Sequence, residues 1–270
     1  GWCPVPRTCP VRGPGRRRGS RWPARRICPA GAATPALSPY GFHDVAGSRT
    51  WIAGERHRPA YVLLHGLPMN ADLWAPLAAH LDGPVLAPDL PGLGRSAPAA
   101  SADAWMEALM DPVGTRPVLV AHSLACGPAL RFAAAHPERV GALVLLAPAF
   151  LQAPGARITR SRLAVATLRR MSAARLAGML GVPEGPEVAS ATADLRRPGV
   201  ARRVVAALRT AVAERERSRA LLERAGVPVR IVTGAADPLT VTAGQPVTEI
   251  PGAGHYPQLT HPIEVARAVH

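Results

Sequence analysis

The segment Val118-Leu-Val-Ala-His-Ser-Leu-Ala-Cys-Gly127 constrains the fold of this chain more than any other. An aliphatic run ends at Ser123, which lies among small residues, and an apolar helical pattern follows over Pro128–Ala135. This order predicts a strand, a sharp turn and a helix, with the serine at the apex of the turn. Such a turn exposes the serine oxygen, where a histidine can deprotonate it. We therefore interpret Ser123 as a nucleophile.

Apolar runs with the length of buried strands alternate with helical patterns along most of the chain. This alternation predicts an α/β fold with a mainly parallel central sheet flanked by helices. The predicted strands are His43–Ile52, Ala60–His65, Pro84–Ala87, Val118–Ala121, Val140–Leu146, Val229–Thr233 and Val247–Ile250. The predicted helices beside them are Asn70–Leu81, Asp103–Met110, Pro128–Ala135 and Pro262–Val269.

The strand pattern stops between Pro148 and Val227. Helical patterns replace it over Ile158–Leu180, Val200–Ala213 and Glu214–Ala225. We predict a helical cap over residues 151–226, inserted after the strand that follows the nucleophile helix, and a core formed by residues 37–150 and 227–270. The cap is well placed to cover the carboxyl end of the sheet, where open α/β sheets bind ligands. Residues 1–36 are rich in Arg and Pro, and we predict that this extension is disordered.

The net charge of +14 is unevenly distributed. Residues 1–34 contain eight Arg and no acidic residue, and residues 151–226 contain fifteen Arg and six acidic residues. The remaining core is mildly acidic, which argues against nucleic-acid binding by the whole protein. An Arg-rich cap could instead bind an acidic carrier protein, although a solvated helix face would have the same composition.

Composition also limits the cofactor, compartment and membrane classes. No apolar run approaches the ~18 residues that span a bilayer, and residues 1–34 lack the continuous apolar stretch of a secretory signal. We therefore expect a cytoplasmic protein that makes no membrane contact. Three of the four cysteines precede residue 37 at spacings that fit no zinc site, so we expect neither a metal nor a cofactor.

Two further residues complete a catalytic arrangement with Ser123. Asp237 follows the predicted strand Val229–Thr233, and His255 follows Val247–Ile250. Because the carboxyl ends of parallel strands lie on one edge of a sheet, the three side chains can converge there. The non-catalytic alternatives are that Ser123 only starts a helix, that Asp237 only forms an Asp-Pro turn, and that His255 is a loop residue. Only eleven residues, 236–246, join the last two strands, which leaves little room for a crossover helix.

From about Gly41 to His270 the chain resembles the α/β-hydrolase superfamily. The resemblance is carried by the 118–127 segment together with His65-Gly-Leu-Pro68, Asp89-Leu-Pro-Gly-Leu-Gly-Arg-Ser96, His136-Pro-Glu-Arg-Val140, Gly234-Ala-Ala-Asp237 and Gly254-His255. Asn70-Ala-Asp-Leu-Trp74 and the Asp89–Ser96 loop are most similar to small carboxylesterases of the pimeloyl-acyl-carrier-protein methyl ester esterase type. One departure is that Ala121 and Ala125 occupy positions where the family usually has glycine.

The resemblance implies a serine hydrolase of carboxylic esters that forms an acyl-enzyme intermediate. Ser123 would attack the acyl carbon, His255 would transfer the proton, and Asp237 would orient the histidine. The backbone N–H groups of Leu67 and Leu124 would form the oxyanion hole. A cap rich in small aliphatic residues predicts a small-molecule ester with an apolar acyl group as substrate.

The neighbouring polar residues receive structural interpretations. His65 is expected to orient the oxyanion loop, Asp89 to fix its own glycine-rich loop, and His122 to point away from the nucleophile. Thioesterase, lactonase, haloperoxidase-like and carbon–carbon bond hydrolase activities use the same triad, so they stay open. Two non-enzymatic alternatives are a ligand-binding member of the fold and a nucleic-acid binder that uses the Arg-rich segments.

Overall fold

The computed structural model describes residues 40–152, 162–239 and 246–270. The extension predicted to be disordered, residues 1–36, lies outside the described residues. Along the three described ranges, no helix is long and apolar enough to cross a membrane.

One eight-stranded sheet forms the centre of the molecule, in the order β1-β2-β4-β3-β5-β6-β7-β8. All neighbours from β4 to β8 are parallel, whereas β2 pairs antiparallel with both β1 and β4. This arrangement confirms the predicted α/β class and the mainly parallel sheet. The strands are β1 (Tyr40–Val45), β2 (Ser48–Ala53), β3 (Tyr61–Leu64), β4 (Val85–Pro88), β5 (Val118–His122), β6 (Ala142–Leu146), β7 (Val229–Gly234) and β8 (Thr248–Ile250).

The prediction of a single strand over His43–Ile52 is wrong, because the chain reverses there into the β1–β2 hairpin. Ala46 and Gly47 form the turn with φ values of 52° and 72°. Positive φ at both central residues gives the turn the twist of its flanking strands. The turn contains neither Asn nor Pro, and the extended pattern runs straight through it, so the reversal left a weak signal in the sequence.

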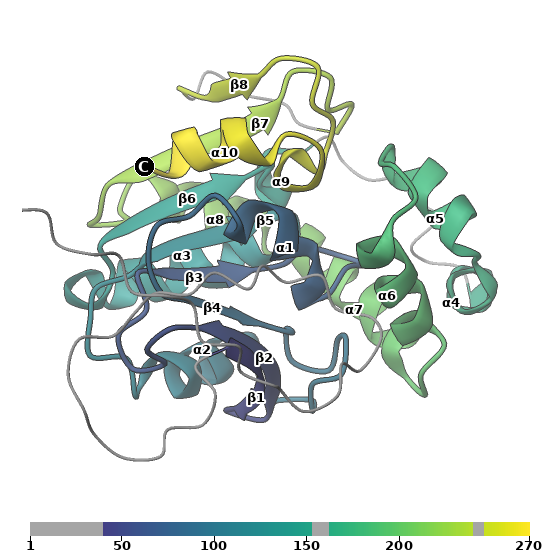
Figure 1. The fold of residues 1–270 in the computed structure, drawn as a ribbon, viewed down its shortest axis with the longest axis horizontal. Helices are drawn as coiled ribbons and strands as arrows, with labels where there is room; N and C mark the ends of the chain where they lie inside the picture. The colour runs from purple at the N-terminus through teal and green to yellow at the C-terminus, as the bar shows by residue number, and fades with distance from the viewer. Residues whose placement is uncertain (1–39, 153–161, 240–245) are drawn as a thin grey trace, which may run out of the picture.

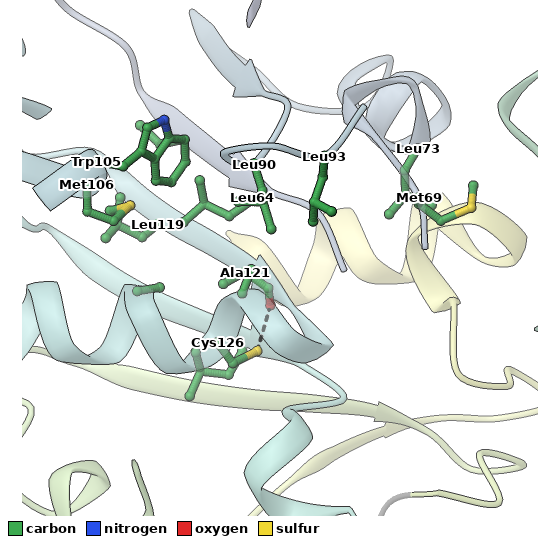
Figure 2. Close-up of a cluster of buried hydrophobic side chains, with 14 of the residues drawn as sticks. Leu64, Met69, Leu73, Leu90, Leu93, Trp105, Met106, Leu119, Ala121 and Cys126 are labelled. Atoms are coloured by element: carbon green, nitrogen blue, oxygen red, sulfur yellow. Dashed lines mark hydrogen bonds between the residues drawn. The ribbon is translucent and has the colours of Figure 1, made fainter. Parts of the chain in front are cut away.

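Helices cover both faces of the sheet (Figure 1). Alternate residues of β5 face opposite ways: Val120 belongs to a core with α1 (Ala75–Ala78) and α10 (Pro262–Val269), whereas Leu119 and Ala121 belong to a core with α2 (Ala102–Met110) and α3 (Cys126–Ala135). Figure 2 shows Trp105 and Met106 of α2 beside Leu119 in the second core. Burial on both faces explains why the parallel strands are continuous apolar runs.

The helix predicted over Asn70–Leu81 is shorter than expected. A 3-10 turn, η1 (Ala71–Trp74), precedes α1, and Pro76 lies in the first turn of α1. Proline is tolerated there because the first N–H groups of a helix have no partner within it. The Asn70 side chain accepts from the Asp72 N–H and so starts the 3-10 turn.

Between β6 and β7, where the cap is predicted, the described residues form five α-helices. They are α4 (Arg162–Arg170), α5 (Ala173–Leu180), α6 (Pro186–Leu195), α7 (Val200–Ala213) and α8 (Arg215–Leu222). In the described part of Ile158–Leu180 the expected single helix is divided, because Ser172 caps a new helix by accepting from the Arg175 N–H. The sequence analysis predicts no helix between Leu180 and Val200 and so misses α6, where Pro186 is tolerated because it lies in the first turn.

The helices between β6 and β7 lie at two different places on the core. In Figure 1, α4, α5 and α6 lie beyond the carboxyl ends of the strands, whereas α8 lies beside α3. Buried polar contacts attach α6 to the core: Asn70 Nδ2 donates to Asp194 Oδ2 at 2.7 Å and to Ser190 Oγ at 2.9 Å. The α6 helix is therefore fixed directly above the loop that follows β3.

Candidate active site

Ser123 lies at the turn between β5 and α3, as the sequence predicts. Its φ of 51° is in the left-handed region, a strained conformation for serine that projects its side chain from the end of the strand. Ala121 and Ala125 on either side are completely buried, so alanine is small enough for this close approach of strand and helix. Cys126 Sγ, also buried, donates to the Ala121 carbonyl at 3.1 Å and ties the helix start to the strand (Figure 2).

The loop after β3 reaches Ser123 through Gly66. A Cβ atom on Gly66 would lie 2.5 Å from His122 Nδ1 and 3.0 Å from Ser123 Cβ. Glycine therefore lets this loop pack directly against the turn, which brings the next residue, Leu67, close to the serine.

His65 controls the orientation of the Gly66–Leu67 peptide. Its Nε2 accepts from the Leu90 N–H at 2.9 Å, so Nδ1 carries the proton and donates to the Gly66 carbonyl at 3.0 Å. In a trans peptide the C=O and the following N–H point in opposite directions. Holding the Gly66 carbonyl therefore directs the Leu67 N–H away from His65, in agreement with the structural role predicted for this histidine. Burial lowers the pKa of His65, which favours this neutral form.

The structure brings Ser123, His255 and Asp237 together in one hydrogen-bonded series. His255 Nε2 lies 3.2 Å from Ser123 Oγ, and His255 Nδ1 lies 2.8 Å from Asp237 Oδ2. A carboxylate only accepts, so Nδ1 is the protonated nitrogen and Nε2 is free to accept the serine proton. The Asp237 side chain is completely buried and its Oδ1 also accepts from the Leu239 N–H. This geometry can transfer a proton from serine to histidine.

Close backbone packing holds the Asp237 and His255 loops together. A Cβ atom on Gly234 would lie 2.2 Å from the carbonyl oxygens of both Ala253 and Gly254. The Ala236 N–H donates to the Ala253 carbonyl at 2.9 Å. Gly234 therefore permits a spacing between the two loops that no other residue would allow.

His122 supports the His255 loop rather than the substrate. The His122 ring is completely buried, and its Nε2 donates to the His255 carbonyl at 2.8 Å. Burial, followed by the nearby His255, lowers its pKa well below the ordinary value of 6.5. The sequence did not indicate this bond between His122 and the His255 backbone.

Tyr256 connects the His255 loop to the oxyanion loop. Its hydroxyl donates to the Leu67 carbonyl at 2.5 Å, and its ring contacts the His122 ring at a centroid distance of 4.7 Å. Burial raises the pKa of Tyr256, so the hydroxyl stays a donor over the whole physiological range. The sequence interpretation missed this residue, although it directly follows His255.

Gln152 is the second residue that the sequence interpretation missed. Its Nε2 lies 3.2 Å from Ser123 Oγ. Gln152 lies six residues beyond Leu146 and belongs to none of the motifs that carry the resemblance, so the sequence gives no signal for it.

Asp89 performs the structural role predicted for it. Its completely buried carboxylate accepts from the Ala71 N–H at 2.7 Å, the Arg95 N–H at 2.9 Å and Arg49 Nε at 2.9 Å. These bonds fix the loop that follows β4, whose leucines line the cavity beside the serine turn.

A cavity of about 450 Å³ lies beside the turn, between α2, α3 and α7. Its wall includes Leu124 and Ala125 but not Ser123 itself, and Figure 2 shows three of its leucines, Leu64, Leu90 and Leu93, close together. One end is polar, because Arg131 binds both Asp103 and Glu214 at 2.8 Å. The apolar lining includes Leu64, Leu90, Leu93, Trp105, Leu124, Phe150 and Ala207. In the described ranges, no three His, Cys, Asp or Glu side chains cluster as metal ligands would.

The parallel sheet with helices on both faces and a serine at its central strand end is the architecture of an α/β hydrolase. The profile of the alpha/beta hydrolase family matches residues 61–268, and the chain belongs to this family. This membership confirms the superfamily indicated by the motifs.

The chain is also similar to individual known proteins, two in sequence and one in structure. A pimeloyl-[acyl-carrier protein] methyl ester esterase of Aromatoleum aromaticum is 29% identical over 78% of this chain and 96% of its own length. Lipase LipV of Mycobacterium tuberculosis is 46% identical, but over only 34% of this chain and 38% of the lipase. The crystal structure of Cfl2 from Burkholderia cenocepacia shares the fold with a TM-score of 0.65 and 24% identity, covering 84% of this chain and 92% of that one.

Proposed function

We propose that this protein hydrolyses carboxylic esters through Ser123, His255 and Asp237, with an acyl-enzyme intermediate. The observation that carries the proposal is the series of hydrogen bonds from Ser123 Oγ to His255 Nε2 and from His255 Nδ1 to Asp237. The names of the two similar proteins, an esterase and a lipase, support ester substrates.

The reaction has two halves. In acylation, Ser123 Oγ attacks the ester carbon as its proton passes to His255 Nε2, and the same proton then goes to the departing alcohol oxygen. In deacylation, His255 takes a proton from water, the hydroxide adds to the acyl carbon, and the proton returns to Ser123 as the acid leaves. Asp237 keeps Nδ1 protonated and stabilises the charged imidazole in both halves.

The oxyanion is bound by the N–H groups of Leu67 and Leu124. Leu124 directly follows the nucleophile, and the Gly66 contact holds the Leu67 peptide beside the serine turn. His65 orients this peptide through the Gly66 carbonyl. Each donor of this kind typically contributes ~3 kcal/mol to transition-state stabilisation.

The acyl chain lies in the apolar cavity beside Leu124, which makes an aliphatic acyl group the preferred substrate part. Filling the cavity tests this assignment, because Ala207 in α7 is part of its wall. Ala207→Phe should lower kcat/KM for longer acyl chains and spare acetyl esters. An unchanged chain-length profile would show that the acyl group binds elsewhere.

The predicted cap contributes α4, α5 and α6, which lie beyond the carboxyl ends of the strands and present arginine side chains to solvent. Arg169 and Arg170 of α4 and Arg175 of α5 are exposed, and they are suited to the acidic surface of a carrier protein that delivers the acyl group. Charge reversal of these three residues should raise KM for a carrier-linked ester and leave KM for the free ester unchanged. Separately, we propose a cytoplasmic location, as predicted from the sequence.

A panel of esters, thioesters and lactones with graded acyl chains tests the activity, and Ser123→Ala is the control. We expect ester turnover by the wild type, none by Ser123→Ala, and labelling of the wild type alone by a fluorophosphonate probe. A Ser123→Ala variant that retains turnover would refute the nucleophile. Wild-type protein that binds esters without cleaving them would favour the ligand-binding alternative.

A further inference from the structure

The side chain of Gln152 is held against the nucleophile by two hydrogen bonds. Its Nε2 lies 3.0 Å from the Ala147 carbonyl and 3.2 Å from Ser123 Oγ. A carbonyl oxygen only accepts, so the bond to Ala147 identifies the NH₂ end of the amide as the end that faces the site. The second N–H of this nitrogen therefore points to the serine oxygen.

The backbone of Ala147 is strained where it holds this amide. Its φ is 44°, which alanine rarely adopts, and its N–H donates to the Val232 carbonyl at 2.8 Å. In the described part of the chain, only Ala46, Ser123 and Ala147 are non-glycine residues with positive φ. Two of these three residues, Ser123 and Ala147, directly follow the adjacent strands β5 and β6. Strain of this kind concentrates at functional sites.

The hydrogen bonds of the serine hydroxyl leave one position open. Its proton faces His255 Nε2, and one of its two lone pairs receives the N–H of Gln152. The other lone pair is available to the acyl carbon. We propose that Gln152 is a fourth catalytic side chain, which acts on Ser123 Oγ as the acyl-enzyme is cleaved; the inference rests on the ester hydrolysis proposed above.

The effect of Gln152 differs between the two halves of the reaction. When the acyl-enzyme is hydrolysed, the C–Oγ bond breaks, its electron pair stays on Oγ, and the proton on His255 Nε2 moves to the same oxygen. Negative charge builds on Oγ during this step, and the Gln152 N–H stabilises it. The ester Oγ of the acyl-enzyme is a poor acceptor, so this hydrogen bond strengthens as the C–Oγ bond breaks. In acylation the serine hydroxyl already accepts the same N–H before it attacks, so the bond adds little to that rate. Gln152 therefore accelerates deacylation more than acylation.

Replacing Gln152 with methionine tests this asymmetry, since methionine retains the length of the side chain without a donor. Stopped-flow measurement with a p-nitrophenyl ester gives acylation, and intact-mass analysis of the decaying acyl-enzyme gives deacylation. Loss of a hydrogen bond to a charged group should slow deacylation about 10-fold to 100-fold. Acylation should change by no more than about threefold, so the variant should show a burst of nearly one p-nitrophenolate per serine.

Gln258→Met is the matched control. Gln258 is completely buried, and its side-chain atoms have no hydrogen-bond partner, so this variant should retain both rates. Gln152→Leu is a second variant, which likewise removes the donor, and it should also slow deacylation selectively. Equal losses in both steps, or no loss in either, for a folded Gln152→Met protein would overturn the role of Gln152. Wild-type protein that never forms an acyl-enzyme would instead overturn the proposed function.

Discussion

Acidification should destabilise this protein through His122, whose ring is buried in the neutral form. Nε2 is committed to the His255 carbonyl, and Nδ1 has no hydrogen-bond partner and faces Gly66. A proton on Nδ1 would place a charge in an apolar contact without compensation, which is why burial lowers the pKa of this ring.

Proton linkage gives the direction and the size of the change in the free energy of unfolding. Below the ordinary pKa of 6.5, the unfolded chain protonates His122 and the folded protein does not, so the free energy of unfolding falls as the pH falls. One such proton costs ~1.4 kcal/mol for each pH unit below that value, until the folded pKa is reached. Against a typical stability of about 5–15 kcal/mol, this is a substantial loss.

Urea unfolding of the wild type and of His122→Gln between about pH 8 and about pH 5 measures the effect. Gln can still donate to the His255 carbonyl but does not titrate, and every other group is common to both proteins. The stability of the wild type should therefore fall more steeply, by up to about 1.4 kcal/mol per pH unit below pH 6.5. Parallel curves would refute the reasoning. If His122→Gln does not fold, the ¹⁵N shifts of the wild-type ring at acidic pH answer the same question, because a protonated ring would contradict it.

Three further substitutions test other parts of the structure. Asp237→Asn should lower kcat by about four orders of magnitude with little change in the melting temperature, and a mild loss would mean that another acid serves. Gly234→Ala should separate the Asp237 and His255 loops and abolish turnover, whereas a fully active variant would disprove the close contact. Ala46→Asn should raise the free energy of unfolding by about 0.5–1 kcal/mol without affecting kcat, since asparagine tolerates positive φ; a loss of stability would contradict the turn.

Local patterns were sufficient for the sheet and the catalytic order. Burial on both faces leaves the parallel strands without polar interruptions, so β3, β5, β6 and β7 were recognised within a few residues of their observed ends. The same patterns gave wrong element limits where the effect of a short turn or a proline depended on its surroundings. Ala46-Gly47 reverses the chain with one glycine and neither Asn nor Pro, and Pro186 begins α6 in a segment where no helix is predicted.

The second layer of the site depends on contacts that no local pattern contains. His122 is next to the serine in sequence, yet its partner is a carbonyl 133 residues away. Tyr256 binds the Leu67 carbonyl across 189 residues, and Gln152 reaches Ser123 across 29. Residues so far apart in the sequence come into contact only because the ends of β3, β5, β6 and β8 lie at the same edge of the sheet.

The sequence by itself determined the α/β class, the family and the three residues that the site brings together. Apolar periodicity records which residues are buried, and side chains that follow parallel strands must share one edge of the sheet. The tertiary structure alone decided which amide, phenol and imidazole support the serine, the oxyanion loop and the histidine. A hydrogen bond depends on separations of a few tenths of an ångström between distant residues, and those separations are set by strand register and loop packing.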